Sequence, residues 1–259
     1  MIKMDLEKNI TIITHTSKEN LKWSESCIMS QKNYTKNHEM NHIIYEGVNV
    51  FQRDITWSRF RLIQEKISEK SNEDVIVWMD SDLLIMDPYF DLRSLVDQFM
   101  HDPALICFFP LGGMLDLGLI IIKPDSSLKE IFEFGWDVGK IEAHGNRRDK
   151  FSFELMQYLN PAIFKSASAE NIVSNWYPTG PNGFFNQKVD SSEGSIGKFW
   201  FKRPTEMLNN YPDLYLPGCF AVHLHQKGPR LKETATDFLN YRSLLTNEME
   251  EAKKFFDYL

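Results

Sequence analysis

VIVWMDSDLLIMDP, at residues 75–88, sets a run of apolar, β-favouring residues against two aspartates one residue apart, Asp80 and Asp82. In an extended chain, residues i and i+2 point to the same side, so both carboxylates can converge on one point. At the carboxyl edge of a strand in an α/β sheet, that point is where ligands bind. Anionic oxygens there suit Mg²⁺ or Mn²⁺, which in turn can hold a diphosphate. The pattern therefore predicts a metal-assisted nucleotide site.

Length and composition are those of a globular protein. The chain has 259 residues, of which 42% are hydrophobic and 25% are charged, so it can bury a substantial core and is not a disordered protein. A formal net charge of -7 argues against broad nucleic-acid binding, which needs a basic surface. We expect a single domain over residues 1–259.

The cysteines and the apolar runs indicate the compartment. Three widely spaced cysteines, Cys27, Cys107 and Cys219, form neither a disulfide framework nor a zinc knuckle and are typical of buried thiols in a reducing compartment. The charged N-terminal stretch MIKMDLEKNI lacks a signal-peptide core, and no apolar run approaches the length of a membrane helix. We therefore expect a cytoplasmic protein with no transmembrane segment.

Periodicity predicts alternating strands and helices. Strands are expected at residues 9–16, 42–50, 74–80, 104–110, 115–124 and 216–225. Helices are expected at residues 57–70, 91–100, 127–141, 151–159 and 233–259. The resulting order, β-β-α-β at first and then mixed strands with a helical tail, predicts an α/β fold with later antiparallel elements.

Four motifs in sequence order resemble those of the GT-A glycosyltransferases. They are WMDSDLLIMDP, LDLGLIIIK at 115–123, the turn Thr179-Gly180-Pro181, and FAVHLHQKGPRLK at 220–232. The resemblance is closest to the glycogenin-like, plant xylosyl- and galactosyltransferase-like and yeast-type mannosyltransferase-like families with a DxD motif. It implies one GT-A (Rossmann-like) domain with a mixed, mostly parallel central sheet. Within it, residues 9–125 would bind the nucleotide, 126–232 would bind the acceptor and complete the metal site, and 233–259 would form a helix.

The same resemblance implies an activity and a metal site. A glycosyltransferase of this kind moves a sugar from a nucleoside-diphosphate donor, here UDP-linked, to a glycan or other hydroxyl acceptor, and the families resembled suggest retention of configuration. Asp80, Asp82 and His223 would bind Mn²⁺ or Mg²⁺. The register of the histidine strand is open, and His225 is the alternative to His223.

Further residues are expected around the donor. The resemblance places the nucleotide against the exit of the first strand, the helix before the DxD segment and the DxD segment itself. The nucleotide-binding candidates are Thr14, His15, Thr16, Arg59, Asp80, Ser81 and Lys227. Lys227 belongs to a basic cluster with Arg230 and Lys232, and fixed cations there could neutralise a leaving diphosphate.

Sugar transfer also needs polar groups near the anomeric carbon. Asp116 stands where related enzymes carry an asparagine, and Asp149 and Glu154 lie where they carry acidic donor-binding residues. Aromatic faces stack on sugars, so an acceptor platform is a second expectation. Its candidates are Trp176, Tyr177, Phe184 and Phe185.

Two other functions fit parts of the pattern. A haloacid-dehalogenase-like phosphatase also has Asp-x-Asp after a strand, but there a small, hydroxylated pair usually follows where this chain has Leu83 and Leu84. A catalytically inactive carbohydrate-binding module is the third interpretation, because Asp116 departs from the family pattern.

Overall fold

The computed structural model describes residues 9–47, 55–69, 74–94, 96, 105–108, 116–141, 148–160, 162–166, 173–175, 220–224 and 228–256. The described strands are β1 (Ile10–Thr16), β2 (Asn41–Glu46), β3 (Val75–Met79), β4 (Leu83–Ile85), β5 (Leu105–Phe108), β6 (Asp116–Ile122), β7 (Phe164–Ser166), β8 (Val173–Asn175) and β9 (Ala221–His223). The described helices are α1 (Lys18–Leu21), α2 (Glu25–Asn37), the 3₁₀ turn η1 (Ile55–Trp57), α3 (Ser58–Glu69), α5 (Ser126–Ile141), α6 (Arg148–Leu159) and α8 (Pro229–Phe256).

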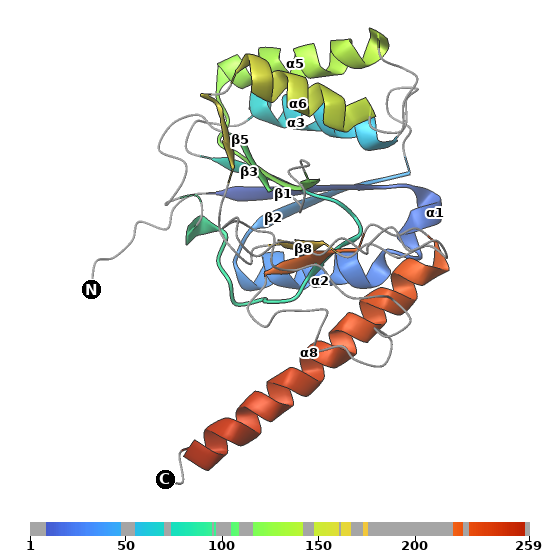
Figure 1. The fold of residues 1–259 in the computed structure, drawn as a ribbon, viewed down its shortest axis with the longest axis vertical. Coiled ribbons are helices and arrows are strands. Elements are labelled where there is room, and N and C mark those ends of the chain that lie inside the picture. Colours follow the sequence, from blue (N-terminus) through green and yellow to red (C-terminus); the bar gives the residue numbers. More distant parts are fainter. Residues whose placement is uncertain are drawn as a thin grey trace, which may run out of the picture.

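A central sheet in the order β2-β1-β3-β6-β5-β7 forms the middle layer (Figure 1). The β1–β2, β1–β3 and β5–β7 pairs are parallel, whereas β6 runs antiparallel to both of its neighbours. Helices α3, α5 and α6 cover one face, and α2 lies on the other (Figure 1). This is the expected α/β fold with a mixed, mostly parallel sheet.

The apolar residues of β3 are buried on both faces of the sheet. Val75, Val77 and Met79 pack into the core cluster on the α2 side, whereas Ile76 and Trp78 pack into the cluster beneath α3, α5 and α6. Because successive strand residues point to opposite faces, a strand covered on both sides reads as one apolar run. This burial explains why the strand could be predicted from the sequence.

A second, three-stranded sheet in the order β4-β9-β8 lies on the α2 side. In the antiparallel β4–β9 pair, Leu83 is opposite His223. The third core cluster joins this sheet to the helices, because Leu84 and Val222 pack with Cys27 of α2 and Phe238 of α8. Beyond this contact α8 extends away from the body of the molecule (Figure 1).

Several boundaries differ from those expected. The early order is β-α-α-β-α-β rather than β-β-α-β, because α1 and α2 intervene between the first two strands. Helix α2 was missed because its buried face includes the polar residues Gln31 and Thr35, which break the apolar periodicity. Strand β4, which was not expected, follows the two aspartates directly.

The remaining differences concern segment ends. Helix α8 begins at Pro229, four residues before the expected start, so Arg230 and Lys232 lie in its first turn. Of the helix expected at 91–100, Arg93, Ser94 and Val96 have helical backbone, and the other positions from 95 onward lie outside the described residues. No described helix is both long and apolar enough to span a membrane.

Phe60 of α3 is expected to be a main contributor to stability. Its ring is fully buried, with ring centroids 4.7 Å from Phe153 and 5.4 Å from Trp57. Phe60→Ala should lower the free energy of unfolding by about 3–5 kcal/mol, the usual cost of truncating a buried phenylalanine. Urea denaturation measures the change, and Glu65→Ala, at an exposed position of the same helix, is the control. A loss below about 1 kcal/mol would show that this layer is loosely packed.

Candidate metal and nucleotide site

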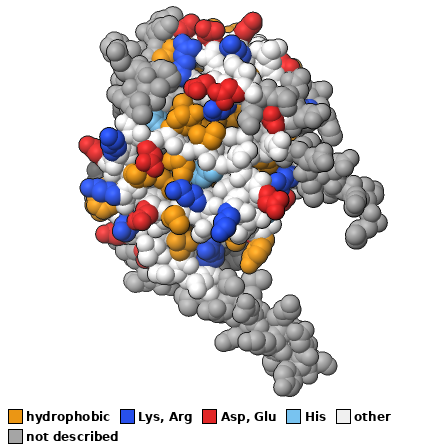
Figure 2. All heavy atoms as spheres, turned by 180° about the vertical axis from the view of Figure 1, so that it is seen from behind, with side chains coloured by type: hydrophobic (Ala, Val, Ile, Leu, Met, Phe, Trp, Pro, Cys, Tyr) orange, Lys and Arg blue, Asp and Glu red, His pale blue; other side chains and the backbone are white. Residues whose placement is uncertain are grey.

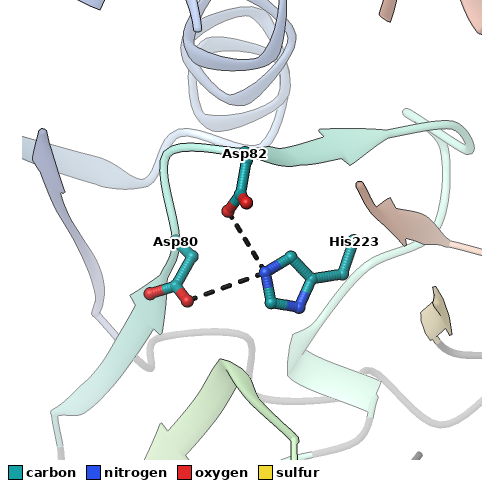
Figure 3. Close-up of side chains that lie close together, drawn as sticks. All are labelled: Asp80, Asp82 and His223. Carbon is teal, nitrogen blue, oxygen red and sulfur yellow. Dashed lines mark hydrogen bonds and ion pairs between the residues drawn. The ribbon is translucent and has the colours of Figure 1, made fainter. Parts of the chain in front are cut away.

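Asp80 and Asp82 lie in a tight turn between the two sheets. Strand β3 ends at Met79, and the Leu83 N–H donates to the Asp80 carbonyl at 3.1 Å, so residues 80–83 form a turn, which we call the DxD turn. The expectation of an extended Asp-x-Asp segment was therefore wrong. The carboxylates nevertheless converge, because the turn brings both of them toward His223 (Figure 3).

Backbone hydrogen bonds fix this turn on both sides. The Asp80 N–H donates to the Gly118 carbonyl at 2.8 Å, which ties the turn to β6. The Leu224 N–H donates to the Asp82 carbonyl at 3.1 Å, which ties it to the end of β9. His223, the last residue of β9, is thereby placed beside Asp82.

The three side chains form a group with the donor set of a divalent cation. His223 Nε2 lies 3.1 Å from Asp82 Oδ1 and 3.7 Å from Asp80 Oδ2, and one ligand atom from each residue lies within 4.8 Å of the others (Figure 3). Neighbouring ligands of an octahedral ion at about 2.1 Å stand about 3 Å apart. Two carboxylates and an imidazole at these separations therefore fit a cation such as Mn²⁺ or Mg²⁺.

Gly118 makes room for the histidine ring. A Cβ atom on Gly118 would lie 2.3 Å from Nδ1 and 2.4 Å from Cε1 of His223. The ring therefore packs directly on the backbone of β6. Of the two alternative ligands, His223 lies against both aspartates. His225 is outside the described residues, so the structure offers no comparison for it.

Arg59 is a buried cation held next to Asp80. Its side chain is 5% exposed, and its Nη2 donates to both carboxylate oxygens of Asp80 at 3.3 Å. The same Nη2 lies 3.6 Å from Asp149 Oδ2, while Nη1 donates to the Leu117 carbonyl at 2.8 Å. Arg59 thus links two of the expected acidic residues, and its guanidinium directly orients Asp80.

Trp78 is a contact that sequence reasoning missed. Its indole Nε1–H donates to Asp80 Oδ1 at 2.6 Å, and the Arg59 guanidinium carbon lies 5.6 Å from the centre of its ring. Residues i and i+2 of a strand share a face, so Trp78 preceding Asp80 by two positions was the available signal.

The candidates at the end of β1 are buried and engaged inside the protein. Thr14 Oγ1 donates to Gln31 Oε1 at 2.9 Å, and the Thr16 hydroxyl donates to the Ser17 carbonyl at 3.4 Å. His15 Nδ1 is hydrogen-bonded to the Ser58 hydroxyl. These residues lie where the nucleotide was expected, and their contact with a nucleotide stays a prediction.

The acidic candidates differ in position. Asp149, in the first turn of α6, contacts Arg59. Glu154 is exposed on the same helix, and five residues rotate it by about 140° from Asp149, onto another face. Asp116 opens β6, which runs antiparallel to β3, so its backbone lies at the edge of the sheet where β3 ends.

Of the three residues in the basic cluster, the structure describes Arg230 and Lys232. Arg230 and Lys232 are exposed in the first turn of α8, and Lys232 Nζ lies 4.0 Å from Glu25 Oε2 of α2. Lys227, the turn Thr179-Gly180-Pro181 and the aromatic platform lie outside the described residues. Acidic and basic side chains are interspersed over the described part of the face shown in Figure 2.

Comparison with known proteins connects this site to an enzyme class. The model of the galactosyl transferase GMA12/MNN10 family matches residues 7–105, which include the DxD turn. The fold is similar to the crystal structure of a glycosyltransferase involved in glycosylation of the major capsid of the virus PBCV-1. That match has a TM-score of 0.60 and 13% identity, over 88% of this chain and 99% of the other. The chain is a glycosyltransferase of the GT-A fold.

Two further structures are similar to this glycosyltransferase at lower scores. An active-site mutant of LgtC matches with a TM-score of 0.48 and 14% identity, over 89% of the enzyme and 95% of that chain. Mouse xyloside xylosyltransferase 1 matches with a TM-score of 0.45 and 9% identity, over 84% of the enzyme and 97% of that chain. No curated protein sequence shows significant similarity to the enzyme.

The contact between Gly118 and His223 is testable in the enzyme. Gly118→Ala should push the imidazole away from Asp82 and weaken Mn²⁺-dependent UDP binding about 10-fold or more, measured by calorimetry. It should also lower the free energy of unfolding, because the added methyl group overlaps a buried ring.

A double variant controls for the cause of this loss. In a His223→Ala background the ring is gone, so Gly118→Ala should cost little or no stability. An equal cost in both backgrounds would contradict the proposed contact.

Proposed function

We propose that the enzyme transfers a sugar from a nucleoside-diphosphate donor, with UDP as the expected nucleotide, to a glycan or other hydroxyl acceptor. In this proposal, Asp80, Asp82 and His223 bind Mn²⁺ or Mg²⁺. The observation that carries the proposal is the convergence of these three side chains at the end of β3 in a GT-A fold. The fold and the family match favour this function over a phosphatase or a binding module.

The charges around the site suit an anionic donor that binds together with a cation. Asp80, Asp82 and Asp149 contribute three negative charges, and Arg59 is the buried cation among them. A bound divalent ion would supply positive charge that stabilises the departing diphosphate. The protein holds Asp80 and Asp82 in fixed positions through contacts with Arg59 and Trp78 and through the backbone hydrogen bonds of the DxD turn.

The acidic residue best placed for the sugar is Asp149. Its side chain is 13% exposed, and its carboxylate contacts the same Arg59 nitrogen as Asp80, so a donor whose diphosphate lies at Asp80 would bring its sugar close to Asp149. We propose that Asp149 contacts donor hydroxyls, with Asp116 as a second candidate at the same edge of the sheet. Glu154, on another face of α6, is the weakest of the three.

Other parts of the proposal rest on the sequence. Retention of anomeric configuration is supported by the families that the chain resembles, and the anomer of the first product, read by NMR, tests it. A cytoplasmic location and one functional domain over residues 1–259 are supported by composition and periodicity.

A donor screen tests the function directly. Hydrolysis of nucleotide sugars in the presence of Mn²⁺ should be fastest with one UDP-linked donor and should stop when the metal is chelated. Thermal stabilisation by UDP with Mn²⁺ is expected in parallel. Stabilisation by phosphate mimics alone, or by free glycans alone, would favour the phosphatase or the binding module instead.

Asp82→Asn tests the metal site. Asparagine keeps the shape of the side chain but removes the charge that holds a cation, so turnover and Mn²⁺-dependent UDP binding should be lost while the fold persists. Asp87→Asn is the control, because Asp87 is a nearby acid whose Oδ1 accepts the Tyr89 N–H at 2.9 Å. Affinity for UDP with Mn²⁺ equal to that of the wild type would overturn the assignment.

Lys227→Ala tests the basic cluster. A cation that grips the leaving diphosphate interacts most strongly once the bond is breaking, so kcat should fall more than the donor KM rises. A lost charge-assisted hydrogen bond costs about 1.5–3 kcal/mol, or roughly a 10- to 100-fold lower rate. Lys36→Ala is the control, because Lys36 is an exposed lysine of α2 outside the basic cluster. Equal kcat values for both variants would remove Lys227 from the site.

A further inference from the structure

Gln31 joins helix α2 to both ends of the DxD turn. Its side chain is fully buried, and its Nε2 donates to the Asp80 carbonyl at 3.0 Å and to the Leu83 carbonyl at 2.8 Å. Asp80 and Leu83 are the first and last residues of the turn, so one side-chain amide spans it. A primary amide has two N–H hydrogens, and both are used here.

The side-chain oxygen of Gln31 accepts the last hydrogen bond in a chain whose donors and acceptors can be assigned. Gln31 Oε1 accepts from the Thr14 hydroxyl at 2.9 Å, and Thr14 Oγ1 lies 3.0 Å from His42 Nε2. A hydroxyl has one hydrogen to donate, so Thr14 must accept from His42, which therefore carries its proton on Nε2. Burial lowers the pKa of His42 to about 4, so the ring is neutral near pH 7 and has one N–H to give.

This chain determines which way the glutamine amide points. If the amide were flipped, its oxygen would face two carbonyl oxygens and its nitrogen would face the Thr14 hydroxyl. The donors on β1 and β2 and the acceptors in the DxD turn therefore select one orientation. Consistent with the proton on Nε2, His42 Nδ1 has no hydrogen-bond partner among the described residues.

Gln31 attaches the turn to α2 through its side chain. Its backbone bonds run to Gly118 on β6 and Leu224 after β9, whereas Gln31 ties it to α2. The preceding residue extends this attachment, since the Ser30 hydroxyl accepts the Ile85 N–H of β4 at 3.0 Å. Without Gln31, two carbonyls that flank Asp82 would lose a buried donor and could tilt toward other partners.

We propose that Gln31 is a positioning residue for the metal site: it sets the separation and direction of the Asp80 and Asp82 carboxylates by holding both ends of the DxD turn. This inference rests on the proposed function, because it assigns Gln31 a role toward the cation bound by those carboxylates. The Gln31 amide is fully buried and hydrogen-bonded inside the protein, so in this proposal it acts through the backbone of the turn.

The test measures Mn²⁺ binding directly, by calorimetry on the full chain without donor. Gln31→Met keeps the approximate volume and removes both donors, and it should weaken Mn²⁺ binding about 10- to 100-fold, the usual effect of losing an outer-shell partner. Gln31→Asn keeps an amide that is one methylene too short to reach both carbonyls, and it should give a smaller loss. This second variant carries the test if Gln31→Met does not fold.

Gln64→Leu is the matched control. Gln64 is also a buried helical glutamine whose Nε2 donates to a backbone carbonyl, that of Lys129, at 3.3 Å, and whose Oε1 accepts from Arg61 at 2.7 Å. It lies on α3, on the opposite face of the sheet. Its loss should lower stability without changing Mn²⁺ affinity, which separates a positioning effect from a general loss of packing.

A kinetic readout adds a second line of evidence. If Gln31 acts on metal binding, the Mn²⁺ concentration that gives half-maximal rate should rise in its variants while saturating Mn²⁺ restores most of kcat. The proposal is overturned if the folded Gln31 variants bind Mn²⁺ as tightly as wild type or Gln64→Leu. Unchanged Mn²⁺ binding in Asp82→Asn would instead overturn the metal site itself, so the two failures are distinguishable.

Discussion

The hydrogen bond from the Leu83 N–H to the Asp80 carbonyl is the interaction on which the rest of the site depends. It closes the turn that carries the chain out of the six-stranded sheet and into the three-stranded one. Because β4 begins at Leu83, the turn also sets the start of the pairing with β9, and that pairing carries His223 to Asp82. The geometry of one turn thereby fixes the relation between both sheets and all three candidate ligands.

Buried charge is the second constraint. Arg59 is almost completely removed from water, and an unpaired cation there would be strongly destabilising. Asp80 and Asp149 compensate it, together with the carbonyl groups of Thr56 and Leu117. The guanidinium in turn keeps Asp80 from turning toward solvent. Asp80 and Asp149 are therefore part of the folded core on the side of α3, while the side chains of Asp80 and Asp82 remain 20% and 21% exposed.

The sequence predicted the elements whose burial produces a simple pattern. Strand β3 and helix α3 were recognised because their inward positions are apolar, and the two aspartates were recognised because they interrupt such a run. Helix α2 was missed because it points the polar residues Gln31 and Thr35 inward. Gln31 is hydrogen-bonded to Thr14 of β1 and Leu83 of β4, which are far from it in sequence. The ion pair between Arg59 and Asp80 could not be predicted either, because Arg59 reaches Asp80 only once α3 has packed against the sheet. The choice between His223 and His225 depends on the register of β9, which is set by pairing rather than by local sequence.

His223 and Asp82 are 141 residues apart in the chain, and this separation has a consequence for folding. Their approach closes a loop that contains β5, β6 and β7, half of the strands described in the central sheet. The conformational entropy lost in closing so long a loop must be offset by contacts made at its ends. A cation shared by the two residues acts as a reversible cross-link across that loop. Binding to the folded chain alone then stabilises the fold by mass action, by about 2.7 kcal/mol at a ligand concentration 100 times Kd. Under the proposed function, a divalent ion would therefore change how much of the protein is folded as well as how fast it works.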